Sequence, residues 1–189
     1  MINQIHTRMK YNFMNKLKMA AVAATVLFST AGYAQTTDKS ASATGETFGN
    51  TLNLGLGLGY GGIGGGPGLL FNYEFGLAKN FTLAPFIGFR SYDGGYYTHT
   101  LVPIGAKGTY YFDELLKAPA EWDFYLAASL GYSVNSISYR SSYVGPQNID
   151  NTYLFLTGHI GAEYHVSKKV GIFLDLGSGL STIGVALHM

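Results

Sequence analysis

The chain has 189 residues, no cysteine and a formal net charge of +1, and 12% of its residues are charged, against roughly 25% in a typical soluble domain. The lack of cysteine excludes a disulfide scaffold and a cysteine-based metal site, and the balanced charge gives no indication of a nucleic-acid partner. No apolar run reaches the length of about 18 residues that a membrane helix needs.

Residues 1–34 are predicted to be a secretory signal peptide. A positively charged start precedes the short apolar segment Met19 to Phe28, and Gly32-Tyr33-Ala34 offers the small residues that precede a cleavage site. We therefore expect cleavage before Gln35. Residues 35–50 are polar and aperiodic, and we expect a flexible segment on the periplasmic side.

Residues 51–60, TLNLGLGLGY, alternate strictly between two kinds of side chain. The leucines fall on one parity, and Asn53 with three glycines falls on the other. Alternation with a period of two indicates a strand with two different faces. A glycine face suits neither a packed core nor a water-facing surface. Leucine against lipid and glycine against a narrow barrel interior would explain both faces.

The same alternation recurs in seven further segments, and their apolar parity contains no charged side chain. These segments are 68–77, 81–92, 99–112, 122–138, 152–166, 170–177 and 180–189. Because an open sheet edge in lipid leaves backbone groups unpaired at a cost of several kcal/mol each, the sheet must close, and an even number of strands is usual. The prediction for residues 51–189 is an all-β fold: an eight-stranded antiparallel transmembrane β-barrel with up-and-down topology.

The segments between the strands predict an orientation and some irregular points. With both ends of the barrel in the periplasm, the longer loops 91–98 and 139–151 face outside, together with 61–67 and 177–180. We expect one helical turn within 113–121. The apolar parity changes after Val134, which predicts a β-bulge. Two prolines, Pro85 and Pro103, predict an irregular hairpin because each removes a ladder donor.

Aromatic residues gather at the predicted strand ends, which is typical of the two interfacial girdles of a membrane barrel. The periplasmic set is Phe81, Tyr110, Phe112, Trp122, Phe124 and Tyr164, and the outer set is Tyr60, Tyr92, Tyr96 and Tyr97.

The signal ending GYAQ, the eight amphipathic segments and the last segment, STIGVALHM, resemble the small eight-stranded outer-membrane β-barrels of Gram-negative bacteria, the OmpA/OmpX-type and "porin-family" proteins. The resemblance covers about residues 50–189. It implies multi-pass insertion in the cell outer membrane, with outer-membrane lipid and the outer-membrane assembly machinery as partners. Members of that family usually end in phenylalanine, whereas this chain ends in Met189.

The charged and histidine side chains on the inward parity form a candidate interior cluster. They are Glu74, Arg90, Lys107, His159, Glu163 and Asp175, with His165 on the same parity. Counting residues from the turns predicts two groups, Glu74–Lys107–Glu163 and Asp175–Arg90. Side chains can fill a barrel of eight strands, and buried charges are tolerated when they are paired. We therefore expect a filled interior, with a narrow path for small solutes or ions as the alternative.

A remote alternative is lipid chemistry. His165-Val166-Ser167 resembles the His-x-Ser of outer-membrane lipid A deacylases, in which a histidine activates the serine and a carboxylate, here Glu163, orients the histidine. The pair lies at the predicted periplasmic end, whereas that chemistry faces the outer leaflet. We expect no enzyme, no cofactor and no metal. The expected role is structural, or interaction with an extracellular partner through loops 91–98 and 139–151.

Overall fold

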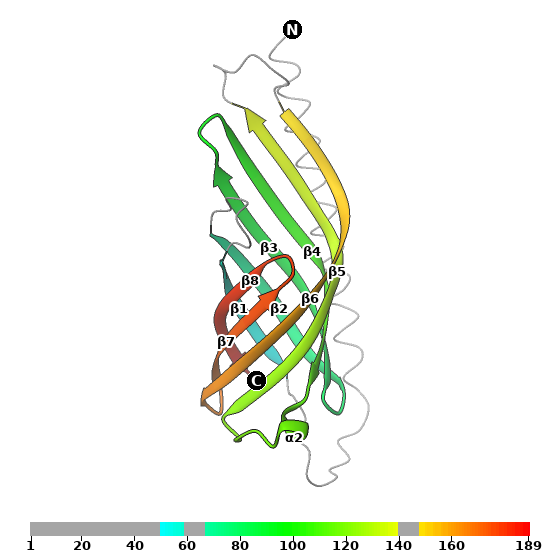
Figure 1. Ribbon diagram of the computed structural model, residues 1–189, viewed down its shortest axis with the longest axis vertical. Coiled ribbons are helices and arrows are strands. Elements are labelled where there is room, and N and C mark those ends of the chain that lie inside the picture. The colour runs from blue at the N-terminus through cyan, green and yellow to red at the C-terminus, as the bar shows by residue number, and fades with distance from the viewer. Residues whose placement is uncertain (1–49, 59–66, 140–147) are drawn as a thin grey trace. The chain divides into compact units, whose positions relative to one another are not determined.

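The computed structural model describes residues 50–58, 67–139 and 148–189. Eight antiparallel strands form a closed barrel in which each strand pairs with its neighbours in the chain and β8 returns to β1 (Figure 1). The strands are β1 (Thr51–Leu58), β2 (Gly68–Ala78), β3 (Phe81–Asp93), β4 (Tyr97–Tyr111), β5 (Trp122–Tyr139), β6 (Asn148–Ser167), β7 (Val170–Gly177) and β8 (Ser181–His188). The predicted up-and-down barrel is confirmed. The predicted signal peptide and the segment 35–49 lie outside the described residues.

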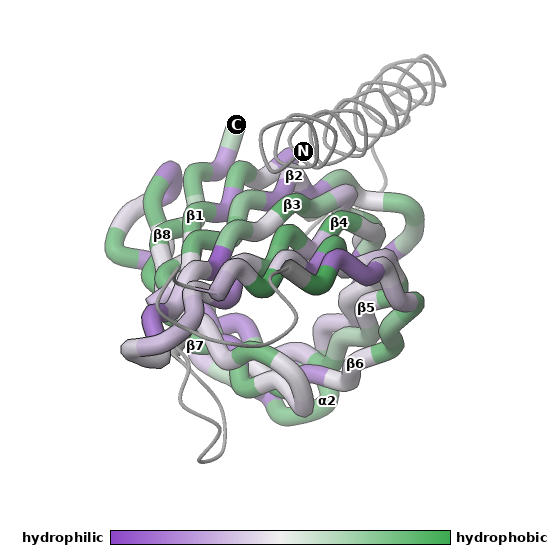
Figure 2. Tube along the Cα trace, turned by 90° about the horizontal axis from the view of Figure 1, so that it is seen from above, coloured by the Kyte–Doolittle hydropathy of each residue, from purple (hydrophilic) through white to green (hydrophobic). Residues whose placement is uncertain are grey.

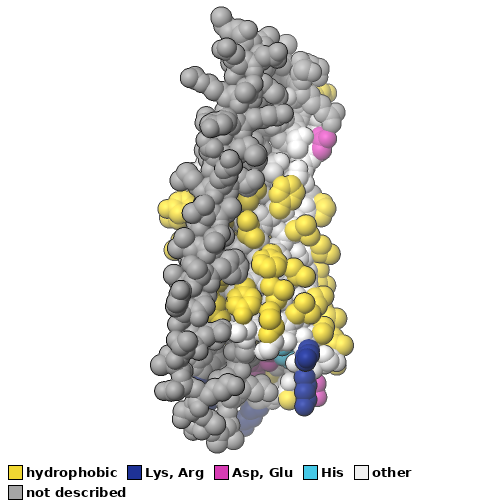
Figure 3. Space-filling view, turned by 180° about the vertical axis from the view of Figure 1, so that it is seen from behind, with side chains coloured by type: hydrophobic (Ala, Val, Ile, Leu, Met, Phe, Trp, Pro, Cys, Tyr) yellow, Lys and Arg dark blue, Asp and Glu magenta, His cyan; other side chains and the backbone are white. Residues whose placement is uncertain are grey.

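The two faces of the wall follow the alternation in the sequence. Along β7, for example, every second side chain is buried, and the apolar residues between them are exposed. Leu56, on the outward parity of β1, is 57% exposed. Seen along the barrel in Figure 2, hydrophobic and hydrophilic residues alternate around a closed ring, and Figure 3 shows apolar side chains gathered over the middle of the wall. Within the described residues, no helix is long and apolar enough to cross a bilayer.

One short helix, α2 (Asp113–Leu116), lies between β4 and β5 and confirms the predicted helical turn. Lys117 ends it in the left-handed conformation, with φ of 52°. We call this end of the barrel the α2 end. β1 begins here and β8 ends here, because Thr51 pairs with His188.

The strands β3 to β6 continue past the others on the side away from α2 (Figure 1). β6 has 20 residues, whereas β1, β7 and β8 have 8 each. We call residues 90–93, 97–101, 135–139 and 148–151 the strand extension; their pairing is in register across all four strands.

The predicted loops 91–98 and 139–151 are therefore longer than the loops in the structure. β4 begins at Tyr97 and β6 at Asn148, so strand covers part of 91–98 and of 139–151. Apolar alternation could not reveal these ends, because they are largely polar. The loop 61–67 falls outside the described residues except for its last residue.

The bulge predicted after Val134 is wrong. β5 pairs without a register shift to both neighbours through this stretch, up to Tyr139 with β4 and Ser138 with β6. The apolar parity changes there because the stretch lies in the strand extension. Shifts occur instead between Gly76 and Ala78 and between His165 and Ser167.

The irregularity predicted at the two prolines is found at Pro103 alone. The β3–β4 ladder has no pair between Ile87↔Ile104 and Arg90↔Leu101, where Pro103 removes a donor. Pro85 instead lies in the ladder opposite Ala106, so the prolines do not face each other.

Four of the six aromatic side chains predicted for the periplasmic girdle are exposed on the outer face at the α2 end: Phe81, Tyr110, Trp122 and Tyr164. Trp122 stacks on Phe124 with ring centroids 5.9 Å apart, contacts Tyr164 at 5.0 Å, and lies on the outward face. The outer set is wrong for Tyr92 and Tyr97, which share the inward parity of Arg90 and Leu101. Tyr60 lies outside the described residues.

Candidate functional site in the barrel interior

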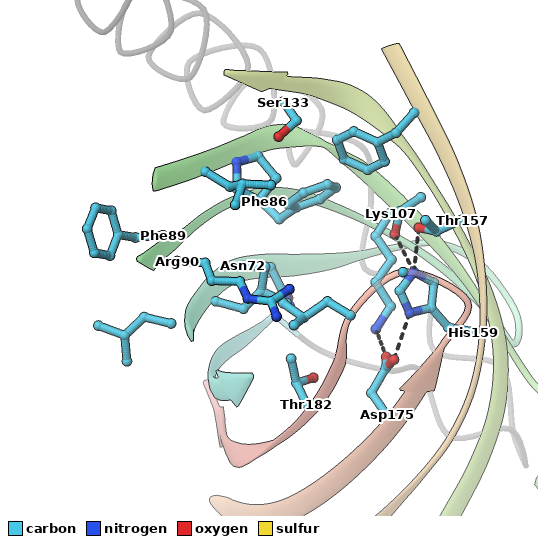
Figure 4. Close-up of a pocket in the computed structure, with 18 of the residues that line it drawn as sticks. Asn72, Phe86, Phe89, Arg90, Lys107, Ser133, Thr157, His159, Asp175 and Thr182 are labelled. Carbon is cyan, nitrogen blue, oxygen red and sulfur yellow. Dashed lines mark hydrogen bonds and ion pairs between the residues drawn. The ribbon is translucent and has the colours of Figure 1, made fainter. Parts of the chain in front are cut away.

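A salt bridge crosses the middle of the lumen. Lys107 Nζ, from β4, donates to Oδ2 of Asp175, from β7, at 2.7 Å. Nδ1 of His159, from β6, lies 2.7 Å from Oδ1 of the same carboxylate, and the Tyr125 hydroxyl, from β5, donates to Oδ2 at 3.3 Å. Figure 4 shows Lys107 and His159 converging on Asp175. We call these four residues the Asp175 cluster.

The polar atoms of the cluster are partnered by one another and by two neighbouring hydroxyl groups. The Lys107 and Asp175 side chains are 10% and 4% exposed, and the Lys107 ammonium also lies 4.9 Å from the centre of the Tyr125 ring. The second nitrogen of His159 contacts the hydroxyls of Ser129 and Thr157 at 3.1 and 2.9 Å. Buried charges are tolerated when they are paired and hydrogen-bonded in this way.

Glu74, from β2, is surrounded by neutral donors. Asn53 donates to its Oε2 at 3.1 Å, and Thr82 and Tyr111 donate to its Oε1, Tyr111 at 2.7 Å. The Tyr111 ring meets Tyr125 edge to face at 5.7 Å, which joins this carboxylate to the Asp175 cluster. The lumen is therefore packed between these two groups.

A third group lies at the α2 end. Nε2 of His188 lies 2.7 Å from Oε1 of Glu163, and Nε2 of His165 lies 2.7 Å from Oδ2 of Asp123. The two imidazole rings lie side by side, tilted by 31°, with centroids 4.9 Å apart, and Nδ1 of His188 contacts the Thr51 hydroxyl at 3.1 Å. We call Asp123, Glu163, His165 and His188 the histidine cluster.

All six predicted residues are on the inner face, but the predicted group of Glu74, Lys107 and Glu163 is wrong. Lys107 joins Asp175 and not Glu74 or Glu163, and Glu163 joins His188. Residue counts from the turns ignore the stagger of tilted strands around a barrel, so side chains at equal counts do not share a height. Arg90 points into the lumen from β3 (Figure 4).

A cavity of about 220 Å³ lies beside the Asp175 cluster. Its lining includes Asn72, Phe86, Arg90, Ser133, Thr157 and Thr182, together with Lys107, His159 and Asp175 (Figure 4). The lumen is thus packed between Asp175 and Glu74 and hollow next to Arg90.

The strand extension carries aromatic side chains on its inward parity. The hydroxyls of Tyr92 and Tyr97 are 2.6 Å apart and their rings meet edge to face, and Tyr97 contacts Tyr139 with centroids 6.0 Å apart. At the tip of the hairpin, Gly95 has a φ of 84° and Tyr96 is 70% exposed.

The sequence prediction missed Asp123, Tyr125 and His188 as interior residues. The parity of β5 places Asp123 and Tyr125 on the same face as Ser129, so this signal was present in the sequence. Nothing in the spacing indicated that His188, on β8, would meet Glu163, on β6, because β7 separates those two strands.

A closed antiparallel barrel with an apolar outer wall and a buried polar interior is a transmembrane β-barrel, because only closure satisfies every backbone group in lipid.

No protein-family model and no curated protein matches the chain. Among solved structures, neisserial surface protein A has 16% identity and a TM-score of 0.56, over 74% of this chain and 96% of that one. The N-terminal barrel domain of Pseudomonas aeruginosa OprF has 13% identity and a TM-score of 0.52, over 75% and 98%. The fold is thus that of the small eight-stranded outer-membrane barrels, as the resemblance implied.

Proposed function

We propose that the protein is an integral outer-membrane barrel with a non-conducting interior and a structural or surface-interaction role. The α2 end faces the periplasm and the strand extension faces outside. Outer-membrane lipid surrounds the wall, and the outer-membrane assembly machinery inserts it. The observation that carries the proposal is the Lys107–Asp175 salt bridge, which spans the lumen above the packed Glu74 group.

Conduction would require this packing to open. An ion on the barrel axis would have to displace Lys107 or His159 from Asp175, which separates a buried pair of charged groups. The Tyr111–Tyr125 contact narrows the same region. The cavity near Arg90 favours the alternative of a narrow porin for small solutes or ions, but it lies beside the salt bridge and not through it.

The strand extension is the surface that would meet a partner. Its tyrosines present large, stiff rings, a residue type that is frequent at binding hot spots. The contacts from Tyr92 through Tyr97 to Tyr139 hold three of these rings in place before binding. The partner would be extracellular and would engage the regions 91–98 and 139–151.

The contacts of Ser167, in the His-x-Ser segment 165–167, favour a protein without catalytic activity. The Ser167 hydroxyl accepts from the backbone N–H groups of Lys169 and Val170, which builds the β6–β7 turn. Asp123 orients the His165 ring as a catalytic carboxylate would, but the Ser167 hydroxyl is engaged by the turn. Lipid A extracted from cells that express the protein should match that from cells that lack it. A deacylated product that disappears with Ser167→Ala would establish the enzyme instead.

Single-channel conductance tests the closed interior. The chain is refolded in detergent, its barrel is verified by heat-modifiable gel mobility, and it is then inserted in a planar bilayer. We expect no discrete steps from the folded protein. Lys107→Ala and Asp175→Ala open the lumen, whereas Leu176→Ala changes the neighbouring outward position of β7 and serves as the control. Steps from the unmodified protein that change with Lys107→Ala, but not with Leu176→Ala, would establish the porin.

A further inference from the structure

The histidine cluster brings together ligand atoms from strands that are not neighbours. Atoms of Glu163, His165 and His188 that can bind a metal all lie within 4.8 Å of one another. Glu163 and His165 are two residues apart on β6 and so share the inward face. His188 comes from β8, and β7 runs between the two strands.

Gly171 of β7 makes this meeting possible. It pairs with His165 on one side and Ala186 on the other, so it lies between β6 and β8. A Cβ atom on Gly171 would overlap the Glu163 carboxylate. Because Gly171 has no side chain, the Glu163 side chain can pass over β7 and reach His188.

The cluster pairs each of two buried carboxylates with an imidazole. Asp123 and Glu163 are 4% and 5% exposed, and each has a histidine as its partner. Among the described residues, the buried lysine is Lys107, and its ammonium group is already paired with Asp175. A dication bound here would neutralise the charge of two buried carboxylates.

From these observations we propose that Glu163, His165 and His188 bind one transition-metal dication of the Zn²⁺ type at the α2 end of the lumen. Imidazole with carboxylate suits zinc and its first-row neighbours, whereas magnesium and calcium prefer oxygen ligands alone. Three protein ligands suffice for a zinc site that keeps one position for water.

The surrounding contacts orient the ligands. The Thr51 hydroxyl holds Nδ1 of His188, which directs Nε2 of that ring toward Glu163. Asp123 holds His165 as carboxylates commonly hold a metal-bound histidine. Nε2 of His188 and the Glu163 oxygen are 2.7 Å apart. Ligands of tetrahedral zinc are about 3.3 Å apart for bonds of about 2.0 Å, so a small side-chain movement admits the ion.

The site joins β6 to β8, and β8 closes the barrel against β1. A bound metal would therefore cross-link the closing strand to the wall two strands away. Because an ion that binds only the folded state stabilises it by mass action, zinc should raise the temperature at which the barrel loses its compact gel mobility.

The test uses the full chain, refolded in detergent and stripped of metal with a chelator. Zn²⁺ is titrated by calorimetry, and Co²⁺ is titrated by its visible absorption, which is strong only for four-coordinate cobalt. We expect one ion per chain and no competition from excess Mg²⁺. His188→Gln, His165→Gln and Glu163→Gln should each weaken binding at least 10-fold, and Asp123→Asn about 10- to 100-fold. His99→Gln is the control, because His99 contacts Asn135 in the strand extension.

Two results would overturn the proposal. One is the absence of saturable zinc binding by a barrel shown to be folded. The other is binding that persists in both Glu163→Gln and His165→Gln, which would place the ion elsewhere. If His188→Gln fails to refold, these two variants still decide the question. Conductance is measured separately, so failure of the metal site leaves the proposed closed interior in place.

Discussion

Replacing Lys107 by methionine removes one partner of the lumen salt bridge and keeps most of the side-chain volume. At 2.7 Å and an effective dielectric constant of about 20, the direct attraction is about 6 kcal/mol, part of which offsets desolvation. In Lys107→Met, the Asp175 carboxylate keeps His159 and Tyr125 as partners. We therefore expect a loss of about 3 kcal/mol, at the lower end of the range of about 3–5 kcal/mol for breaking a buried pair.

A double-mutant cycle separates the pair from the packing around it. Lys107→Met, Asp175→Asn and the double variant are unfolded by denaturant in lipid vesicles, with Trp122, the only tryptophan of the chain, as the fluorescent reporter. The double variant should be less destabilised than the sum of the single variants by at least about 2 kcal/mol, because neither charge is then left alone.

A coupling energy below about 0.5 kcal/mol would refute this reasoning, because solvent-exposed pairs contribute at that level. Such a result would mean that water screens Lys107 from Asp175. It would favour a hydrated path through the lumen and with it the porin alternative.

Two further variants test the wall. Leu56→Arg, on the lipid face, should cost about 2–4 kcal/mol near the bilayer midplane, whereas Thr157→Arg, facing the cavity, should cost less in the same unfolding assay; equal stability of Leu56→Arg and the unmodified protein would contradict the assignment of the faces. Gly171→Ala should cost about 1–3 kcal/mol by overpacking, because the added Cβ overlaps Glu163. Gly158→Ala is its control, since a Cβ there meets nothing within 4 Å, and similar stabilities of the two variants would show that Glu163 does not cross β7 at Gly171.

The alternation of apolar and polar side chains predicted the strands well in the part of the wall that faces lipid. In β7 the predicted and observed ends coincide at Val170 and Gly177. In β6 the prediction began four residues late, because Asn148 to Asn151 lie in the strand extension and are mostly polar. The bulge after Val134 failed for the same reason: alternation identifies faces only where the two sides of a strand meet different surroundings.

The sequence by itself determined which side chains face the lumen, because parity along a strand is a local property with a period of two. Glu74, Lys107, Glu163 and Asp175 could all be placed inside on that ground. Only the tertiary structure decided which of them meet. The stagger between strands brings Lys107 and Asp175 to the same level along the barrel axis. The absence of a side chain at Gly171 lets Glu163 reach His188. Both depend on contacts between strands, which no pattern within one strand records.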